Sequence, residues 1–103
     1  MKAFTLFNIK SNISPEEYRK WSLDQVHPRM LKMPSVLDFR DYEVGGIMEG
    51  GQTPYQFVEE IEITNPEEFE RDNSQGDGAA LAKEWQSRVL DFTVIYCHEI
   101  KDS

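Results

Sequence analysis

One short motif occurs once in each half of this sequence, and it constrains the fold more than any other feature. Residues 14–18 read Ser-Pro-Glu-Glu-Tyr, and residues 65–69 read Asn-Pro-Glu-Glu-Phe. Ser14 and Asn65 can accept a hydrogen bond from a free backbone N–H at a helix start. Proline suits the first helical position, and the second glutamate can complete a capping box. The motif therefore predicts two helices that begin at equivalent points of two similar halves.

Each predicted helix lies between two segments that have the pattern of a β-strand. Residues 2–10 are rich in Phe, Leu, Thr and Ile, and residues 55–63 alternate apolar with polar side chains. After the helices, residues 36–44 stop at a glycine pair and residues 92–100 carry Val, Ile and Tyr. The order is βαββαβ. With right-handed crossovers it predicts one α+β domain over residues 1–103, a ferredoxin-like four-stranded antiparallel sheet with both helices on one face.

Two segments interrupt this pattern. Residues 45–54 contain four glycines and a proline, so they are predicted to form the loop that joins the two halves. Residues 73–78 interrupt the second helical region before residues 79–89 resume it. This second segment is either a plain surface loop or a flexible lid.

Composition excludes several kinds of partner and compartment. The chain has 19 acidic and 11 basic residues and a formal charge of -8, which disfavours nucleic acid and anionic membrane surfaces as partners. One cysteine, Cys97, cannot form an intrachain disulfide, and its apolar surroundings predict a buried, inert thiol. The sequence shows neither a signal peptide nor an apolar span long enough to cross a bilayer. These features predict a cytoplasmic protein.

The first predicted strand is apolar on both sides, which bears on assembly. Phe4 and Leu6 alternate onto one face, while Ala3, Phe7 and Ile9 alternate onto the other. The helices can cover only one face of the sheet, and water on the other face would be costly. A second copy of the chain is the simplest cover, so the sequence predicts a homodimer.

The first helix contains the most suggestive chemistry. Tyr18, Ser22, Val26 and Met30 form a stripe that faces the core, while Trp21 lies to one side. The pair His27-Pro28 is different, because the proline removes the helical hydrogen bond to the carbonyl of the residue four positions earlier and bends the axis. Histidine is also the side-chain type whose ordinary pKa lies closest to neutral pH. Two interpretations stay open for His27: a functional residue turned toward the interior, or a capping or half-exposed histidine.

These residues together resemble a known superfamily, the dimeric α/β barrel proteins, over the whole chain. The residues that carry the resemblance are the 14–18 motif, Trp21, His27-Pro28, the turn Met33-Pro34-Ser35-Val36, Phe39 and Tyr42. The length and the His-Pro pair most resemble the REDY-like HapK group, which is associated with prodigiosin-type pigment pathways, and next the EthD-type group. The resemblance implies a pocket in each subunit between sheet and helices. Such a pocket usually holds a hydrophobic or aromatic metabolite without a bound cofactor, and the resemblance favours the functional interpretation of His27.

Seven further side chains are predicted to contact such a substrate: Asn8, Tyr18, Trp21, Arg40, Trp85, Tyr96 and His98. Several of these residues also have a structural alternative. Asn8 can simply mark the solvated end of its strand, and Arg40 can pair with Asp38 instead of with a ligand. Trp85 aligns with Leu81 and Val89 in a core stripe. For His98 the alternative is a structural histidine with satisfied hydrogen bonds.

Three glutamates, Glu59, Glu60 and Glu62, resemble a metal-binding cluster in the sequence. Strand alternation nevertheless sends Glu59 to the opposite face from the other two. No metal site is therefore predicted.

The sequence lacks the signatures of several enzyme classes. There is no dinucleotide or phosphate loop, no Gly-x-Ser-x-Gly elbow and no histidine pair spaced for zinc. What remains is acid/base or positioning catalysis on an organic substrate. Together with the resemblance, this favours a cofactor-independent enzyme that promotes a condensation, dehydration or rearrangement of an aromatic intermediate. His27 would move the proton while Asn8, Tyr18 or Tyr96 holds an oxygen. Two alternatives stay open: a non-catalytic protein that shields an intermediate or assists a larger pathway enzyme, and a cofactor-free monooxygenase.

Overall fold

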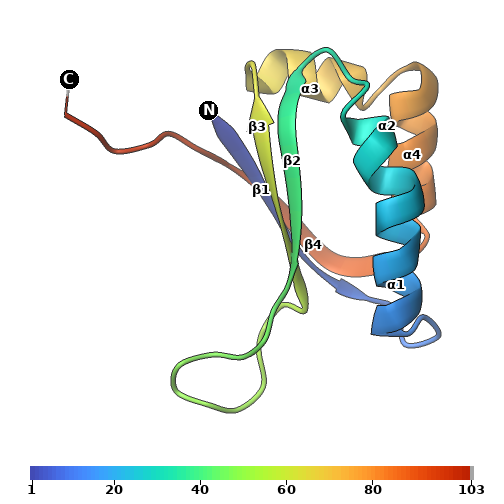
Figure 1. Cartoon of the computed structure of the whole chain (residues 1–103), viewed down its shortest axis with the longest axis vertical. Coiled ribbons are helices and arrows are strands. Elements are labelled where there is room, and N and C mark those ends of the chain that lie inside the picture. Colours follow the sequence, from blue (N-terminus) through green and yellow to red (C-terminus); the bar gives the residue numbers. More distant parts are fainter. Residues whose placement is uncertain (103) are drawn as a thin grey trace.

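The computed structural model describes residues 1–102 and has two layers, a twisted sheet and the helices that cover one of its faces (Figure 1). The first half contains β1 (Lys2–Ile9), α1 (Pro15–Trp21), the π-helix η1 (Ser22–Val26), α2 (His27–Met30) and β2 (Val36–Glu43). The second half contains β3 (Phe57–Ile63), α3 (Pro66–Asp72), α4 (Gly76–Gln86) and β4 (Val89–Cys97). This order confirms the predicted βαββαβ arrangement.

The sheet has the strand order β2-β3-β1-β4, and every neighbouring pair is antiparallel. The first strand of each half, β1 or β3, therefore lies in the centre of the sheet. The last strand of each half, β2 or β4, forms an edge. In this register Glu59 of β3 lies opposite Thr5 of β1 on one side and opposite Asp41 of β2 on the other. The topology confirms the predicted ferredoxin-like fold.

The repeated motif starts both helices as predicted. The Ser14 side chain accepts a hydrogen bond from the backbone N–H of Glu17 at 3.1 Å. In the second half Asn65 accepts one from the N–H of Glu68 at 2.8 Å. Each capping residue is followed by its proline at the start of the helix. These caps fix where each helix leaves the sheet edge.

The bend predicted at Pro28 takes the form of a π-helical turn. Proline lacks the N–H that would bond to the carbonyl four residues earlier, and its ring crowds that carbonyl. The turn before the proline is correspondingly wider, and the N–H of His27 bonds to the carbonyl of Ser22, five residues earlier. The helix continues as α2, and its Arg29 guanidinium bonds to Asp77 and Glu84 of α4 at 2.9–3.0 Å. The two helices are thereby held side by side.

Two boundaries differ from the sequence-based expectation. Residues 76–78, predicted as loop, already belong to α4. A Cβ at Gly78 would lie 1.8 Å from the carbonyl oxygen of Asp72, so only glycine permits α3 and α4 to approach this closely. The last strand begins at Val89 and ends at Cys97, so Val89 belongs to β4 rather than to the helical stripe with Trp85. The shifted strand end leaves His98 beyond the sheet.

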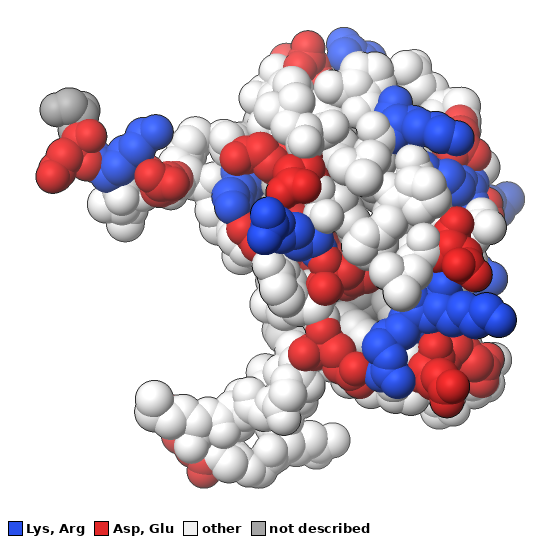
Figure 2. Space-filling view, viewed as in Figure 1, with Lys and Arg blue, Asp and Glu red and all other residues white. Residues whose placement is uncertain are grey.

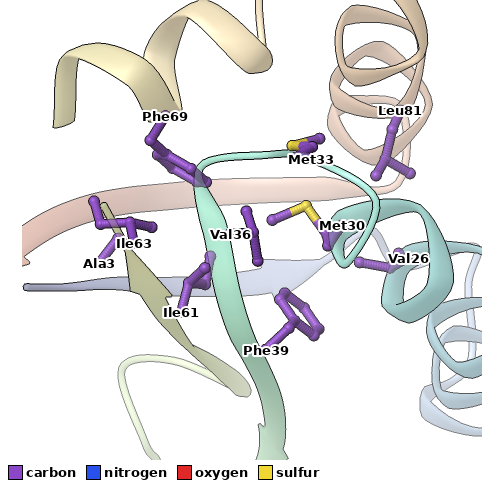
Figure 3. Packing of buried hydrophobic residues seen from close by; sticks show 10 residues of the cluster. All are labelled: Ala3, Val26, Met30, Met33, Val36, Phe39, Ile61, Ile63, Phe69 and Leu81. Atoms are coloured by element: carbon purple, nitrogen blue, oxygen red, sulfur yellow. The ribbon is translucent and has the colours of Figure 1, made fainter. Parts of the chain in front are cut away.

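The helix-facing side of the sheet contributes most of the core. Figure 3 shows the larger buried cluster, in which side chains of β1, β2 and β3 meet the helices. Its buried members are Ala3, Val26, Met30, Met33, Val36, Phe39, Ile61, Ile63, Phe69 and Leu81. A second cluster surrounds Phe7 and Tyr18. Among residues 1–102 no helix is long and apolar enough to cross a membrane.

Candidate ligand cavity

The larger cavity, of about 280 Å³, lies between the sheet and helices α2, α3 and α4. Thr5 and Glu59 from the central strands are polar members of its lining. Its open side runs along the edge strand β4, where Phe92, Val94 and Tyr96 are all exposed. Its remaining lining residues are Val26, Met30, Ile61, Phe69, Glu70, Asn73, Leu81, Ala82, Trp85 and Gln86. The cavity is therefore mainly apolar, with aromatic rings near its mouth.

Trp85 forms one wall of this cavity and is held from several directions. Its indole Nε1 donates a hydrogen bond to the hydroxyl oxygen of Tyr18 at 2.9 Å. The Trp85 ring packs edge-on against Phe7 and Phe92, with centroid distances of 5.0 and 5.1 Å. Burial raises the pKa of Tyr18, so its hydroxyl stays protonated and accepts the bond as a neutral phenol. The wall is thus fixed before any ligand arrives.

A hydrogen bond joins two residues at the mouth of the cavity. The hydroxyl of Tyr96 donates to a carboxylate oxygen of Glu70 at 2.7 Å. Partial burial, followed by this bond to a carboxylate, raises the pKa of Tyr96 to about 12. The mouth therefore carries one phenol and one carboxylate, and the phenol remains neutral near pH 7.

Glu59 is the most unusual residue of the cavity, because it is a carboxyl with only 5% of its surface exposed. Burial raises the pKa of Glu59 well above its usual range, and the negative charge of Asp41 opposite adds to the effect. A hydrogen bond with the Thr5 hydroxyl offsets part of that rise. None of the ion pairs within residues 1–102 includes Glu59. Burial in this position therefore favours the neutral, protonated form of the carboxyl over the carboxylate.

Glu59 and Asp41 face each other across β3 and β2. A smaller cavity, of about 170 Å³, lies on the Asp41 side of this pair. Asp41 and His27 both line it, together with Tyr18 and Ser22. The hydroxyl of Ser22 donates to Oδ2 of Asp41 at 2.5 Å, whereas Oδ1 is buried and has no hydrogen-bond partner within residues 1–102. Burial raises the pKa of Asp41, and the hydroxyl of Ser22 and the nearby imidazole of His27 partly offset this. Two facing carboxyls, half-buried Asp41 and buried Glu59, thus line the smaller and the larger cavity respectively.

Four of the sequence-predicted site residues line a cavity. Trp85 and Tyr96 line the larger one, whereas Tyr18 and His27 line the smaller one. The half-buried imidazole of His27 packs edge-on against Phe39, with a centroid distance of 4.8 Å. His27 is therefore close to Asp41 but is not among the residues that line the larger cavity.

The other four predicted site residues lie outside both cavities. Asn8 is on the outer face, where its side chain bonds to the backbone of Pro54 and Gln56 at 3.1 and 2.9 Å. On the same face, exposed Arg40 pairs with Asp38 at 3.2 Å. The exposed residue His98 follows β4.

Trp21, the fourth, is half-buried against both core clusters. The guanidinium of Arg88 lies 4.1 Å from its ring centroid. The structure thus gives Asn8, Trp21 and Arg40 structural partners of their own. For Arg40 that partner is Asp38, the structural alternative considered in the sequence analysis.

Sequence reasoning missed Glu59 and Asp41 as site residues. The signal for Glu59 was present, because alternation places it on the same face as buried Phe57 and Ile61. For Asp41 the signal was weaker, since a register shift between Val36 and Asp38 breaks the alternation of β2. Within residues 1–102, no group of three or more His, Cys, Asp or Glu side chains is placed to hold a metal ion.

Comparison with known proteins identifies a family. A family model described as REDY-like protein HapK matches residues 1–100 of this chain. A search of curated proteins finds no match. The family match covers nearly all of the chain.

Solved structures share the fold at low sequence identity. HapK from Hahella chejuensis aligns with a TM-score of 0.75 and 16% identity, covering 100% of this chain and 98% of its own. An EthD family protein from Bacillus halodurans aligns with a TM-score of 0.72 and 13% identity, covering 94% of this chain and 97% of its own. SnoaB from Streptomyces nogalater, a cofactor-independent oxygenase, aligns with a TM-score of 0.68 and 10% identity, covering 96% and 93%. Two other matching structures are described as dimeric with a ferredoxin-like fold.

Proposed function

This chain belongs to the REDY-like HapK family, and we propose that it acts without a cofactor on a small hydrophobic aromatic intermediate of prodigiosin-type pigment biosynthesis. The intermediate binds in the larger cavity, between the sheet and the helices. There the protein promotes a condensation, dehydration or rearrangement by acid/base catalysis. The cytoplasm is the proposed compartment.

The observation that supports this function most directly is the buried carboxyl of Glu59 in a mainly apolar, aromatic cavity. Such a cavity binds a hydrophobic ring and excludes water. A carboxyl held in its neutral form can donate a proton to a bound ligand and then take one back. Glu59 is therefore our proposed proton-transfer group inside the larger cavity.

His27 remains our proposed acid/base residue for the smaller cavity. Its imidazole lines the smaller cavity with Asp41, which in turn lies opposite Glu59. A proton lost from Glu59 can therefore be replaced through Asp41 from a residue that is itself half-exposed to solvent. In this arrangement His27 restores the charge state of the carboxyl pair between turnovers.

Two alternatives share the same cavity. A helper protein would bind the intermediate and shield it, or present it to a larger pathway enzyme, without changing it. A cofactor-free monooxygenase has some support, since the structural neighbour SnoaB is described as a cofactor-independent oxygenase. That neighbour shares only 10% of its residues with this chain, so the acid/base proposal takes precedence.

The protein is further proposed to be a homodimer, because one face of its sheet has no cover within the chain. Phe4, Leu6 and Ile95 lie on that face, and Ile95 is 44% exposed. Figure 2 shows two segments, the 44–56 loop and the chain after β4, projecting from the same side of the molecule with a hollow between them. Each segment carries an exposed apolar residue, Met48 in the loop and Ile100 after β4. A second copy seated in the hollow would cover all of them.

Mass spectrometry of pathway extracts incubated with the protein tests the function. The expected result is consumption of an aromatic compound by the wild type and by Glu60→Gln, a neighbouring substitution on the opposite face of β3. At a saturating concentration of the compound, Glu59→Gln should consume it at least about 100-fold more slowly, the usual scale for losing a general acid or base. A compound that is retained but never consumed would favour the helper protein. Consumption that needs oxygen would favour the monooxygenase.

A further inference from the structure

We propose that the larger cavity recognises aromatic ligands that carry a protonated nitrogen, and that the buried carboxyl of Glu59 is the counter-ion of that nitrogen. This inference rests on the proposed function, because it names the chemical class of ligand for the same cavity. It follows from three observations: the shape of the aromatic wall, the isolation of the carboxyl, and the signs of all the charges that face it.

The aromatic wall selects a flat ring. Trp85 and Phe92 pack at an interplanar angle of 70°, so one ring presents its face where the other presents its edge. Phe69 and Tyr96 also line the cavity. An aromatic ligand can pack favourably against either a ring face or a ring edge. A cation is further stabilised when it lies over the face of a tryptophan.

The carboxyl of Glu59 has no cation of its own. Three basic residues of the surrounding elements are engaged elsewhere. Lys2 pairs with Glu60 on the opposite face of the sheet, and Arg29 pairs with Asp77 and Glu84. The guanidinium of Arg88 lies over the ring of Trp21. None of the residues that line the larger cavity is Lys, Arg or His. A buried carboxyl becomes favourable as a carboxylate only when a cation reaches it, and here that cation must enter with the ligand.

The titratable groups that face Glu59 or line the larger cavity favour a cationic ligand. Asp41 faces it from β2, Tyr18 from α1, and Glu70 and Tyr96 line the mouth. Each of these groups is acidic, either a carboxyl or a phenol. His27 of α2 is the nearest imidazole, and it faces Asp41 in the smaller cavity. An anionic ligand would meet two carboxyls and no cation, whereas an ammonium or amidinium would meet a complementary site.

Binding of such a ligand is coupled to a proton. The empty cavity favours the neutral acid form of Glu59, because burial raises its pKa. A ligand that enters as an ammonium ionises Glu59, and one proton leaves for the solvent. The affinity for the ammonium should therefore rise with pH, by up to tenfold per pH unit, while the free protein holds that proton.

A pair of probes of equal size tests the inference by isothermal titration calorimetry. 2-Naphthylmethylamine carries the cation, and 2-naphthylmethanol replaces it with a hydroxyl group. The wild type should bind the amine at least tenfold more tightly than the alcohol at pH 7.5, with a preference that grows between pH 6.5 and 8. Glu59→Gln should bind both probes with similar affinity. Glu60→Gln, the same substitution on the opposite face of β3 and outside the cavity, should keep the wild-type preference.

The outcomes separate this inference from the proposed function. Equal affinities of the wild type for the two probes, or a preference that survives Glu59→Gln, would overturn the counter-ion role and leave an aromatic cavity in place. Failure of both probes to bind would overturn the proposed function together with it. If Glu59→Gln does not fold, the wild type alone decides, because a preference that is constant from pH 6.5 to 8 contradicts the release of a proton.

Discussion

The indole Nε1 of Trp85 and the hydroxyl oxygen of Tyr18 are joined by a 2.9 Å hydrogen bond between α4 and α1, helices from different halves of the chain. The bond holds the tryptophan wall of the cavity on a tyrosine that is 1% exposed. The helix of one half thus positions a ligand-facing residue that belongs to the other.

Replacing Tyr18 by phenylalanine removes the acceptor and leaves the indole N–H without its partner. We expect a loss of about 1 kcal/mol in the free energy of unfolding, seen as a fall of about 4–8 °C in the melting temperature. Tyr96→Phe is the control, because its hydroxyl bonds to Glu70 at an exposed position and its loss should have little effect. Equal shifts in melting temperature for the two variants would mean that the buried hydrogen bond stabilises the fold no more than the exposed one.

The second prediction concerns pH and the buried carboxyl of Glu59. Its pKa is higher in the folded protein than in the unfolded chain, so between these two values the folded state holds more protons. Binding of this proton therefore contributes its whole stabilisation at low pH. As pH rises through that window the contribution to the free energy of unfolding decreases, by up to about 1.4 kcal/mol per pH unit. Glu59→Gln should therefore become progressively more stable than the wild type as pH rises from 5 to 8. Thermal melts across that range measure the difference, and a difference that shrinks with pH contradicts the raised pKa.

The third prediction separates the possible roles of His27. If it transfers protons, His27→Gln should keep ligand affinity while turnover falls by about 100-fold or more. If it only bonds to a ligand, affinity should fall by about 1 kcal/mol and turnover of bound ligand should persist. A lower melting temperature with unchanged binding and turnover would make His27 a structural residue, supported by its contact with Phe39.

The fourth prediction concerns the helix starts. Ser14→Ala and Asn65→Ala should each lower the free energy of unfolding by about 1 kcal/mol, because each removes the acceptor of a helix N–H. Pro15→Ala and Pro66→Ala should change it much less. Urea unfolding of the four variants provides the comparison, and equal losses at all four positions would argue against a capping role.

The fifth prediction concerns assembly. Sedimentation equilibrium at micromolar concentration should show a dimer, and Ile95→Asp should shift it toward monomer, because it places a charge on the apolar outer face. Asp91→Asn, an exposed change on the same strand, is the control. A well-folded wild-type monomer would exclude the proposed pairing of two sheets.

The fold could be predicted because its local signals agree with one another. The caps at Ser14 and Asn65 and the strand patterns each require only neighbouring residues, and they specify the same order of elements. Boundaries were less accurate where tertiary contacts decided them. The start of α4 depends on the close approach of Gly78 to Asp72, which are residues of two different helices.

The cavity was harder to predict because its polar group is defined by what surrounds it. A glutamate in a strand normally faces water, so the alternation that places Glu59 inward was used only to reject a metal site. Its burial depends on side chains of β1, β2 and the helices, which no local pattern reveals. Trp85 and Tyr96 were found because large aromatic residues line most such cavities.

The π-turn of η1 fixes how many residues the first helix must contain. Tyr18, Ser22, Val26 and Met30 are all buried, although a spacing of four drifts by about 40° per step around a regular α-helix. The wider turn cancels part of that drift. Deleting one residue from 23–25 would restore a regular helix, in which the ring of Pro28 would again crowd the carbonyl four positions earlier. Substitutions at these exposed positions should thus be tolerated where a single-residue deletion is not, whereas the 44–56 loop should accept changes in length.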